Sequence, residues 1–176
     1  MNKKILLHIC CGICASSVIE RLKNEGWNVE GFFYNPNIHP EEEYKKRLES
    51  IKLLLTKIGV TLIEGNYDKE DWFKRIEGLE KEKEGGKRCR ICFEMRLRET
   101  LKEAKRRNIQ YFTTTLTVSP HKNSLTINNI GQTIDKDSFI AIDFKKKDGF
   151  KRAMDLSKEY NLYHQNYCGC IFSLPR

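Results

Sequence analysis

The cysteines of this chain fall into three short-spaced groups, and thiols are the side chains that bind transition metals and undergo reversible oxidation. The seven cysteines among 176 residues form the groups Cys10-Cys11-x-x-Cys14, Cys89-x-x-Cys92 and Cys168-x-Cys170. Cysteines that serve only as small core residues would be scattered, whereas short spacing lets one metal centre collect several sulfurs. The grouping therefore predicts metal or redox chemistry.

The first two groups supply enough ligands for one metal centre. Cys10, Cys11, Cys89 and Cys92 offer four thiolates, the number held by a structural zinc or a [4Fe–4S] cluster. Because the side chains of adjacent cysteines tend to diverge, a cuboidal cluster suits them better than a compact zinc tetrahedron. The spacing favours an iron–sulfur cluster, and zinc or unliganded thiols stay open. Cys14 is a further ligand, a thiolate beside the cluster or a structural residue.

The third group has the spacing of a redox pair. A disulfide between Cys168 and Cys170 would close a small, strained ring across Gly169 and would be easily reduced. Such a pair suits cycling between dithiol and disulfide. The alternatives are that these thiols are extra metal ligands or merely buried side chains.

The elements that must position these thiols alternate between strand and helix. Strands are expected at 4–9, 28–34, 60–63, 110–116 and 138–144, and helices after Gly12, over 41–58, after Asp68, over about 90–107 and over 149–160. This alternation predicts a single α/β domain over residues 1–176, with a doubly wound parallel sheet. Ligands of such sheets bind at the carboxyl ends of the strands, where Cys10 and Cys11 fall. Residues 81–87 are a polar, glycine-containing break.

The composition favours a polyanionic partner outside the membrane. The net charge is +8, and basic residues crowd around the second cysteine pair, which predicts a cationic patch for a phosphate-rich substrate. Abundant Lys and Glu are the alternative explanation. The apolar runs are too short to span a bilayer, and Ile5–Leu7 is too short for a signal peptide. Clustered thiols then indicate the reducing cytoplasm.

Taken together, the motifs resemble the QueH-type epoxyqueuosine reductases over nearly the whole chain. The resemblance is carried by His8-Ile-Cys10-Cys11-Gly-Ile-Cys14, Tyr34-Asn-Pro-Asn-Ile-His-Pro40 with Glu43, Tyr44 and Arg47, Arg88-Cys89-Arg-Ile-Cys92-Phe93 with Arg96 and Leu97, residues 114–123, and Tyr167-Cys168-Gly-Cys170 with Phe172 and Ser173. Where the family usually has Ala-Pro in the first group, this chain has Gly12-Ile13, which leaves the thiols in place.

The resemblance implies an oxidoreductase that reduces epoxyqueuosine to queuosine at the wobble position of tRNA, with water as the second product. It implies cluster ligands at Cys10, Cys11, Cys89 and Cys92, and a redox-active pair at Cys168 and Cys170. It also implies a fold similar to the adenine-nucleotide alpha-hydrolases, with a metal loop in place of the phosphate loop. An external electron donor would reset the enzyme.

Several alternatives stay open at this point. An additional iron beside the cluster, held through Cys14 and a carboxylate, is a hypothesis. A cluster-dependent tRNA sulfur transferase and a zinc-stabilised RNA-binding module are the rival functions. The acid that protonates the leaving oxygen could be Asp68, Asp71 or Asp143, and the oligomeric state is undetermined.

Overall fold

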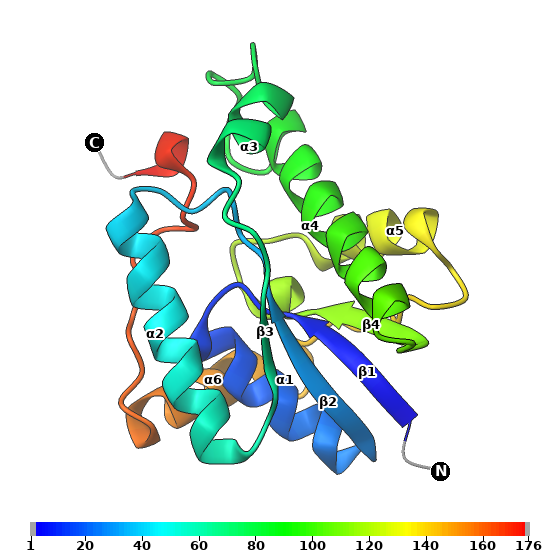
Figure 1. Ribbon diagram of the computed structural model, residues 1–176. Helices are drawn as coiled ribbons and strands as arrows, with labels where there is room; N and C mark the ends of the chain where they lie inside the picture. The colour runs from blue at the N-terminus through cyan, green and yellow to red at the C-terminus, as the bar shows by residue number, and fades with distance from the viewer. Residues whose placement is uncertain (1–2, 175–176) are drawn as a thin grey trace.

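A four-stranded parallel sheet forms the centre of the protein, whose computed structural model describes residues 3–174 (Figure 1). The strands are β1 (Lys3–His8), β2 (Trp27–Phe33), β3 (Leu62–Glu64) and β4 (Tyr111–Thr114). Their order is β3-β2-β1-β4, and each neighbouring pair is parallel. The strand order therefore reverses at β1, and a crevice opens beyond the carboxyl ends of β1 and β4.

Helices cover both faces of this sheet, as the alternating sequence pattern predicts. On one face, α1 (Gly12–Asn24) contacts both α2 (Glu41–Ile58) and α6 (Gly149–Glu159). On the other face, α4 (Lys87–Arg106) packs against β1, β4 and α5 (Ser124–Ile134). The short α3 (Lys69–Arg75) lies beyond the carboxyl end of the sheet (Figure 1). This arrangement confirms the doubly wound α/β class.

Local signals explain where the helices begin and end. The first turn of α2 carries three glutamates, which interact favourably with the helix dipole, and Gly59 ends the helix in the left-handed region at φ 63°. Asp68 caps α3, because its Oδ1 accepts the backbone N–H of Asp71 at 3.0 Å. Both boundaries agree with the prediction.

The expected strand at 138–144 is wrong. Only Phe139 makes an isolated bridge to Phe112 of β4, and residues 143–148 turn toward α6. β4 is also shorter than expected, because the chain enters a 3-10 turn at Thr115–Val118. The helix α5, which the periodicity did not reveal, packs against α4 and the 3-10 turn.

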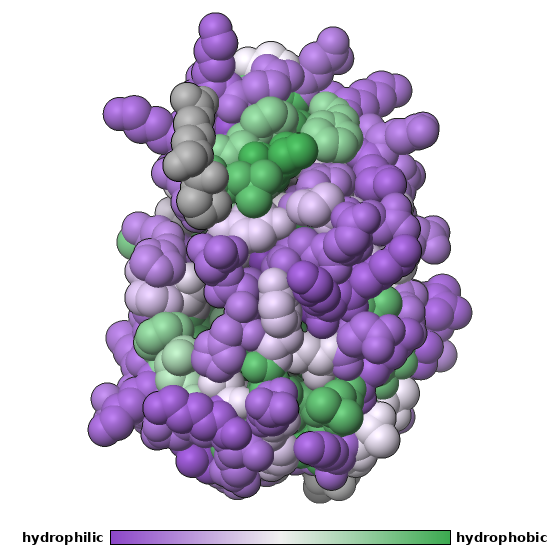
Figure 2. All heavy atoms as spheres, turned by 90° about the vertical axis from the view of Figure 1, so that its left-hand side faces the viewer, coloured by the Kyte–Doolittle hydropathy of each residue, from purple (hydrophilic) through white to green (hydrophobic). Residues whose placement is uncertain are grey.

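The core is built around β1, whose Ile5, Leu6 and Leu7 are fully buried. A strand covered on both faces excludes water from consecutive residues, so it is apolar without alternation. Figure 2 shows that the face carrying α2 is mainly hydrophilic, with separate apolar areas on it. Ile171 and Phe172 are among the exposed large apolar side chains of the described residues. Within residues 3–174, no helix has the length and apolar character needed to cross a bilayer.

Candidate metal and redox centre

Three thiols meet at the amino end of α1. Cys11 caps this helix in an extended conformation, and its sulfur accepts the backbone N–H of Cys14 at 3.4 Å. The sulfurs of Cys10, Cys11 and Cys14 lie within 4.8 Å of one another, and all three residues are buried. Gly12 lets the start of α1 lie close to α2, because a Cβ at this position would lie 2.9 Å from Ser50 Oγ.

Hydrogen bonds among the three thiols separate their pKa values. The pKa of Cys10 lies well below its ordinary value, because the Cys11 and Cys14 thiols hydrogen-bond to its sulfur, and Thr115 Oγ1 also donates to it at 3.4 Å. Donating to Cys10 raises the pKa of Cys11 to about 12 and also raises that of Cys14. Three neighbouring cysteine sulfurs are a soft ligand set, and a bound cation would displace their protons.

The second cysteine group lies in the first turns of α4, as predicted. Cys92 is 7% exposed, and burial raises its pKa to about 12. Arg88 fixes the start of the helix, because its Nη1 donates to the carbonyls of Leu79, Glu80 and Glu82 at 2.7–3.0 Å. Cys89 and Cys92 therefore stand on a backbone that a buried guanidinium holds in place.

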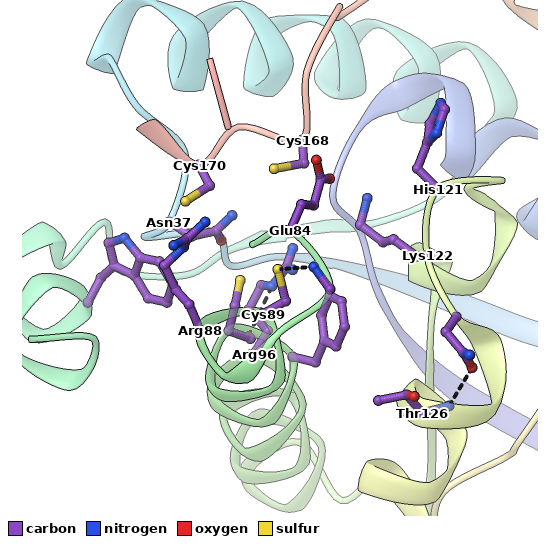
Figure 3. A pocket seen from close by; sticks show the side chains of 15 residues that line it. Asn37, Glu84, Arg88, Cys89, Arg96, His121, Lys122, Thr126, Cys168 and Cys170 are labelled. Atoms are coloured by element: carbon purple, nitrogen blue, oxygen red, sulfur yellow. Dashed lines mark hydrogen bonds between the residues drawn. The ribbon is translucent and has the colours of Figure 1, made fainter. Parts of the chain in front are cut away.

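A small cavity brings this group together with the third one. The cavity is about 50 Å³ in volume and is lined by Cys89, Cys92, Cys168 and Cys170. Figure 3 shows the thiols of Cys168 and Cys170 on one side and Cys89 on the other. All seven cysteines are free thiols in the structure.

A larger cavity of about 450 Å³ adjoins it and reaches the first group. Cys10 and Cys14 line this cavity together with Cys168. Five side chains line both cavities and form their common wall: Glu84, Arg96, His121, Lys122 and Cys168. The three cysteine groups therefore meet around two joined hollows at the carboxyl edge of the sheet, and Cys168 belongs to both.

The C-terminal cysteine pair is held by its backbone. Gly169 has φ +103°, and a Cβ at this position would lie 2.8 Å from Ile38 Cγ1. The backbone N–H of His39 donates to the Gly169 carbonyl at 2.8 Å. Glycine is thus required between the two cysteines on both conformational and steric grounds.

An arginine on α2 completes this support. Arg47 donates to the carbonyls of Cys168 and Tyr167 at 3.2 and 2.9 Å. Its Nε pairs with Glu43 Oε1 at 2.7 Å, and the two side chains are 2% and 8% exposed. Glu43 also accepts the Tyr163 hydroxyl at 2.7 Å. The sequence places Arg47 on α2, but nothing in its spacing indicates that it reaches the cysteine loop.

The four cysteines predicted to hold one metal are divided between two places in the structure. Within residues 3–174, the three-sulfur group contains Cys14 beside Cys10 and Cys11, while Cys89 and Cys92 face the C-terminal pair. Joint ligation by Cys10, Cys11, Cys89 and Cys92 therefore stays a prediction.

The three aspartates considered as possible acids do not line either cavity, and the identity of the acid stays a prediction. Asp68 caps α3, Asp71 pairs with Arg75, and Asp143 pairs with Lys145. Of the described carboxylates, Glu84 is the one that lines both cavities, and it comes from the polar break at 81–87.

His8 packs within β1, as expected. Its ring nitrogens lie 3.0 Å from Thr114 Oγ1 and 3.1 Å from the Tyr34 carbonyl. Burial, with the nearby Arg96 charge, lowers its pKa to about 4, so the ring is neutral. It supports the start of the thiol loop and does not face either cavity.

The cations of the basic helix α4 are partly buried and partly paired, and its role as a cationic patch stays a prediction. Arg88 and Arg96 are buried, at 1% and 3% exposure. The cations farther along the helix are mostly paired with glutamates three or four residues away: Arg98 with Glu94, Lys102 with Glu99, and Arg106 and Arg107 with Glu103. These three glutamates offset only part of the exposed charge, since Arg106 and Arg107 share Glu103, and Lys87 and Arg90 are exposed without an ion pair among the described residues.

The residues fit a thiolate-bound metal. Three buried sulfurs within 4.8 Å of one another are the kind of donor that iron–sulfur clusters and zinc bind. Cys89 and Cys92 line the neighbouring small cavity, and their joining this set stays a prediction. The neighbouring cavity leaves room for a substrate beside it.

Similarity to known proteins agrees with this geometry. A family model described as epoxyqueuosine reductase QueH matches residues 5–176. An epoxyqueuosine reductase QueH from Streptococcus pyogenes serotype M1 is 36% identical, covering 98% of this chain and 71% of the relative. One from Thermotoga maritima is 37% identical, covering 97% and 90%.

Two solved structures share the fold. A predicted subunit of tRNA methyltransferase from Methanocaldococcus jannaschii has a TM-score of 0.61 at 16% identity, covering 89% of this chain and 75% of the other. The U34-tRNA thiolase NcsA from Methanococcus maripaludis, solved with its [4Fe–4S] cluster, has a TM-score of 0.56 at 14% identity, covering 99% and 62%. At these identities the likeness is one of fold.

Proposed function

The chain belongs to the epoxyqueuosine reductase QueH family, and from this premise we propose that it reduces epoxyqueuosine to queuosine at the wobble position of tRNA. The observation that carries the proposal is the meeting of three cysteine groups around two joined cavities, with Cys168 in both. The reaction belongs in the cytoplasm, where tRNA is modified and thiols stay reduced.

The chemistry requires two electrons and two protons. Both carbon–oxygen bonds of the epoxide break, a carbon–carbon double bond forms, and the oxygen leaves as water. Oxidation of Cys168 and Cys170 to a disulfide releases two electrons and two protons, which balances the reduction. An external reductant then returns the pair to the dithiol.

The metal centre is proposed as a [4Fe–4S] cluster held by Cys10, Cys11, Cys89 and Cys92. When bound, it would supply one-electron transfer and a Lewis-acidic iron for the epoxide oxygen. Cys14 lies with the first two ligands and could hold an additional iron. The alternative metal is zinc, which has no redox chemistry and would leave the protein colourless.

The cavity residues have defined tasks in this proposal. The 450 Å³ cavity takes the modified nucleoside and sets its epoxide beside Cys168. Lys122 and His121 lie on the common wall and can donate hydrogen bonds to the leaving oxygen. Glu84 on the same wall can relay a proton. Arg47 keeps the backbone of the cysteine pair in place.

A tRNA sulfur transferase, the rival enzyme, is disfavoured by the loop after β1. Transferases of this type use ATP and need a loop of glycines and serines that binds phosphate after the first strand. Here Cys10, Cys11 and Gly12 occupy that place, and the thiols fill the space near the helix terminus.

The test is anaerobic incubation of the iron-reconstituted protein with tRNA containing epoxyqueuosine and a chemical reductant, followed by digestion and separation of the nucleosides. Queuosine should appear, and the protein should be brown with about four iron atoms per chain. A colourless protein with one zinc, or unchanged epoxyqueuosine, would contradict the proposal.

Two variants separate the proposed roles. Cys89→Ala should lose both the cluster absorbance and the product. Cys168→Ser should keep the absorbance and lose turnover with dithiol reductants. Full turnover by Cys168→Ser would refute the redox role of the pair, and a retained cluster in Cys89→Ala would refute its ligand role.

A further inference from the structure

A third cavity, called the basic hollow below, lies near the first turn of α6. Gly149 lines it, and the next residue, Phe150, lines the 450 Å³ cavity, which is called the thiol cavity below. The basic hollow is about 310 Å³ in volume and lies between the second half of α1 and the start of α6. Four cationic side chains line it: Arg21, Lys146, Lys147 and Arg152. Its carboxylates are Glu20 and Glu25. The charge of this lining is therefore +4 − 2 = +2.

The ion pairs in this hollow leave its lysines free. Arg21 pairs with Glu25 at 2.9 Å, and Arg152 pairs with Glu20 at 2.6 Å. Lys146 and Lys147 have no carboxylate within 4.0 Å among residues 3–174, and both are exposed. The excess charge is thus carried by two adjacent ammonium groups.

The unmet hydrogen-bonding capacity of the hollow also suits an anion. In the described part of the chain, Ser17 Oγ and Arg21 Nη1 have no hydrogen-bond partner, although both atoms are buried. The Ser17 residue itself is only 5% exposed. Both groups donate hydrogen bonds, and buried donors are normally satisfied. A phosphate offers several acceptor oxygens and negative charge, which is what this lining lacks.

The hollow adjoins the thiol cavity through one turn of the chain. Gly149 lines the hollow, and the next residue, Phe150, lines the 450 Å³ cavity. Lys147 and Asp148 have left-handed backbones, with φ 60° and 58°, so the chain reverses sharply between the two sites. A polynucleotide that places one nucleoside in the cavity can carry its backbone across this turn into the basic hollow.

We propose that this hollow binds a backbone phosphate of the substrate RNA next to the nucleotide that enters the thiol cavity. Lys146, Lys147 and Arg21 contact the phosphate, and Ser17 donates to one of its oxygens. The inference rests on the proposed function, since it takes tRNA as the substrate. It adds an electrostatic contact at the 145–152 segment to any that the exposed cations of α4 make.

The test is the salt dependence of tRNA binding by Lys146→Ala/Lys147→Ala. Each phosphate that the protein neutralises in single-stranded RNA contributes about 0.7 to the slope of log K against log salt, so the double variant, which loses this one contact, should have a slope smaller by about 0.7. Between 50 and 200 mM salt the wild type should then lose about 2.6-fold more affinity than the variant. The KM for tRNA should rise correspondingly.

Lys57→Ala/Lys136→Ala is the matched control. Both lysines are exposed and, among the described residues, have no carboxylate within 4.0 Å. The same loss of charge should leave the salt slope and the KM close to those of the wild type. Equal slopes for the wild type and Lys146→Ala/Lys147→Ala, or equal losses in the two double variants, would overturn the proposal.

A free phosphate ion is the other source of the same chemistry. Inorganic phosphate at constant ionic strength should compete weakly with tRNA for the wild type and not for the variant. If phosphate instead raises the melting temperature of the wild type alone while the tRNA slopes stay equal, the site serves a small anion and the proposal fails. Failure of the proposed function would be distinct: the wild type would then make no queuosine.

Discussion

Replacing Arg47 by alanine should lower the free energy of unfolding more than replacing a surface arginine that also pairs with a glutamate four residues before it. Arg47 and Glu43 are four residues apart on α2, with Nε and Oε1 2.7 Å apart and side chains 2% and 8% exposed. Arg47→Ala leaves the Glu43 carboxylate buried with only the Tyr163 hydroxyl as a partner. Breaking one side of a buried pair costs about 3–5 kcal/mol.

Arg98→Ala is the matched control. Arg98 pairs with Glu94 at the same spacing and 2.8 Å, but these side chains are 57% and 47% exposed. Water screens such a pair, which contributes about 0.2–1 kcal/mol. Urea unfolding under anaerobic conditions gives both free energies. Equal losses in the two variants would refute the reasoning from burial.

A second variant separates stability from the positioning of the cysteine pair. Glu43→Gln/Arg47→Met removes both charges and keeps an acceptor for Tyr163, so most of the stability should return. The carbonyls of Tyr167 and Cys168 still lose their donors. Turnover should therefore stay low in a protein that folds as well as the wild type. Wild-type turnover in this variant would show that Arg47 contributes only stability.

Three further predictions follow from the same region. Gly169→Ala should cost more stability and activity than Gly78→Ala, because both glycines have positive φ but only the new Cβ at 169 meets Ile38, at 2.8 Å; equal unfolding free energies would contradict this. Burial and then the Lys69 charge lower the pKa of His39 below its ordinary 6.5, so the unfolded chain takes up the proton first and stability falls as the pH drops below 6.5; an NMR titration midpoint above 6.5 would contradict this. Anaerobic removal of the metal should lower the melting temperature, because the bound metal stabilises only the folded thiol site; an unchanged temperature would mean that the thiols hold no metal in solution.

Elements with strong local signals could be predicted from the sequence. The helix at 41–58 has the predicted bounds, because its apolar periodicity and the terminal Gly59 act over a few residues. The segment 138–144 has the residue types of a strand, yet only Phe139 bridges to β4. Residue types there report burial beside the sheet, and pairing depends on whether the chain can lie along the edge.

The kind of chemistry at the site could also be predicted from the sequence, but not which of the three cysteine groups lie together. The spacing of the cysteines indicated metal and redox chemistry, and the resemblance indicated the family. Which sulfurs lie together depends on where α1 and α4 meet the sheet. Cys14 lies beside Cys10 and Cys11 through the local geometry of the cap of α1, whereas the packing of α4 turns Cys89 toward Cys168.

The sequence by itself determined most of the helices and the grouping of the thiols along the chain, since these follow from residue types and spacing, and its resemblance to a family implied the class of reaction. Only the tertiary structure decided which ion pairs contribute strongly to stability. Arg47–Glu43 and Arg98–Glu94 have the same spacing on a helix, yet α2 buries the first pair under the cysteine loop and α4 leaves the second in water. Burial sets the strength of a charge interaction, and burial depends on contacts between residues far apart in the sequence.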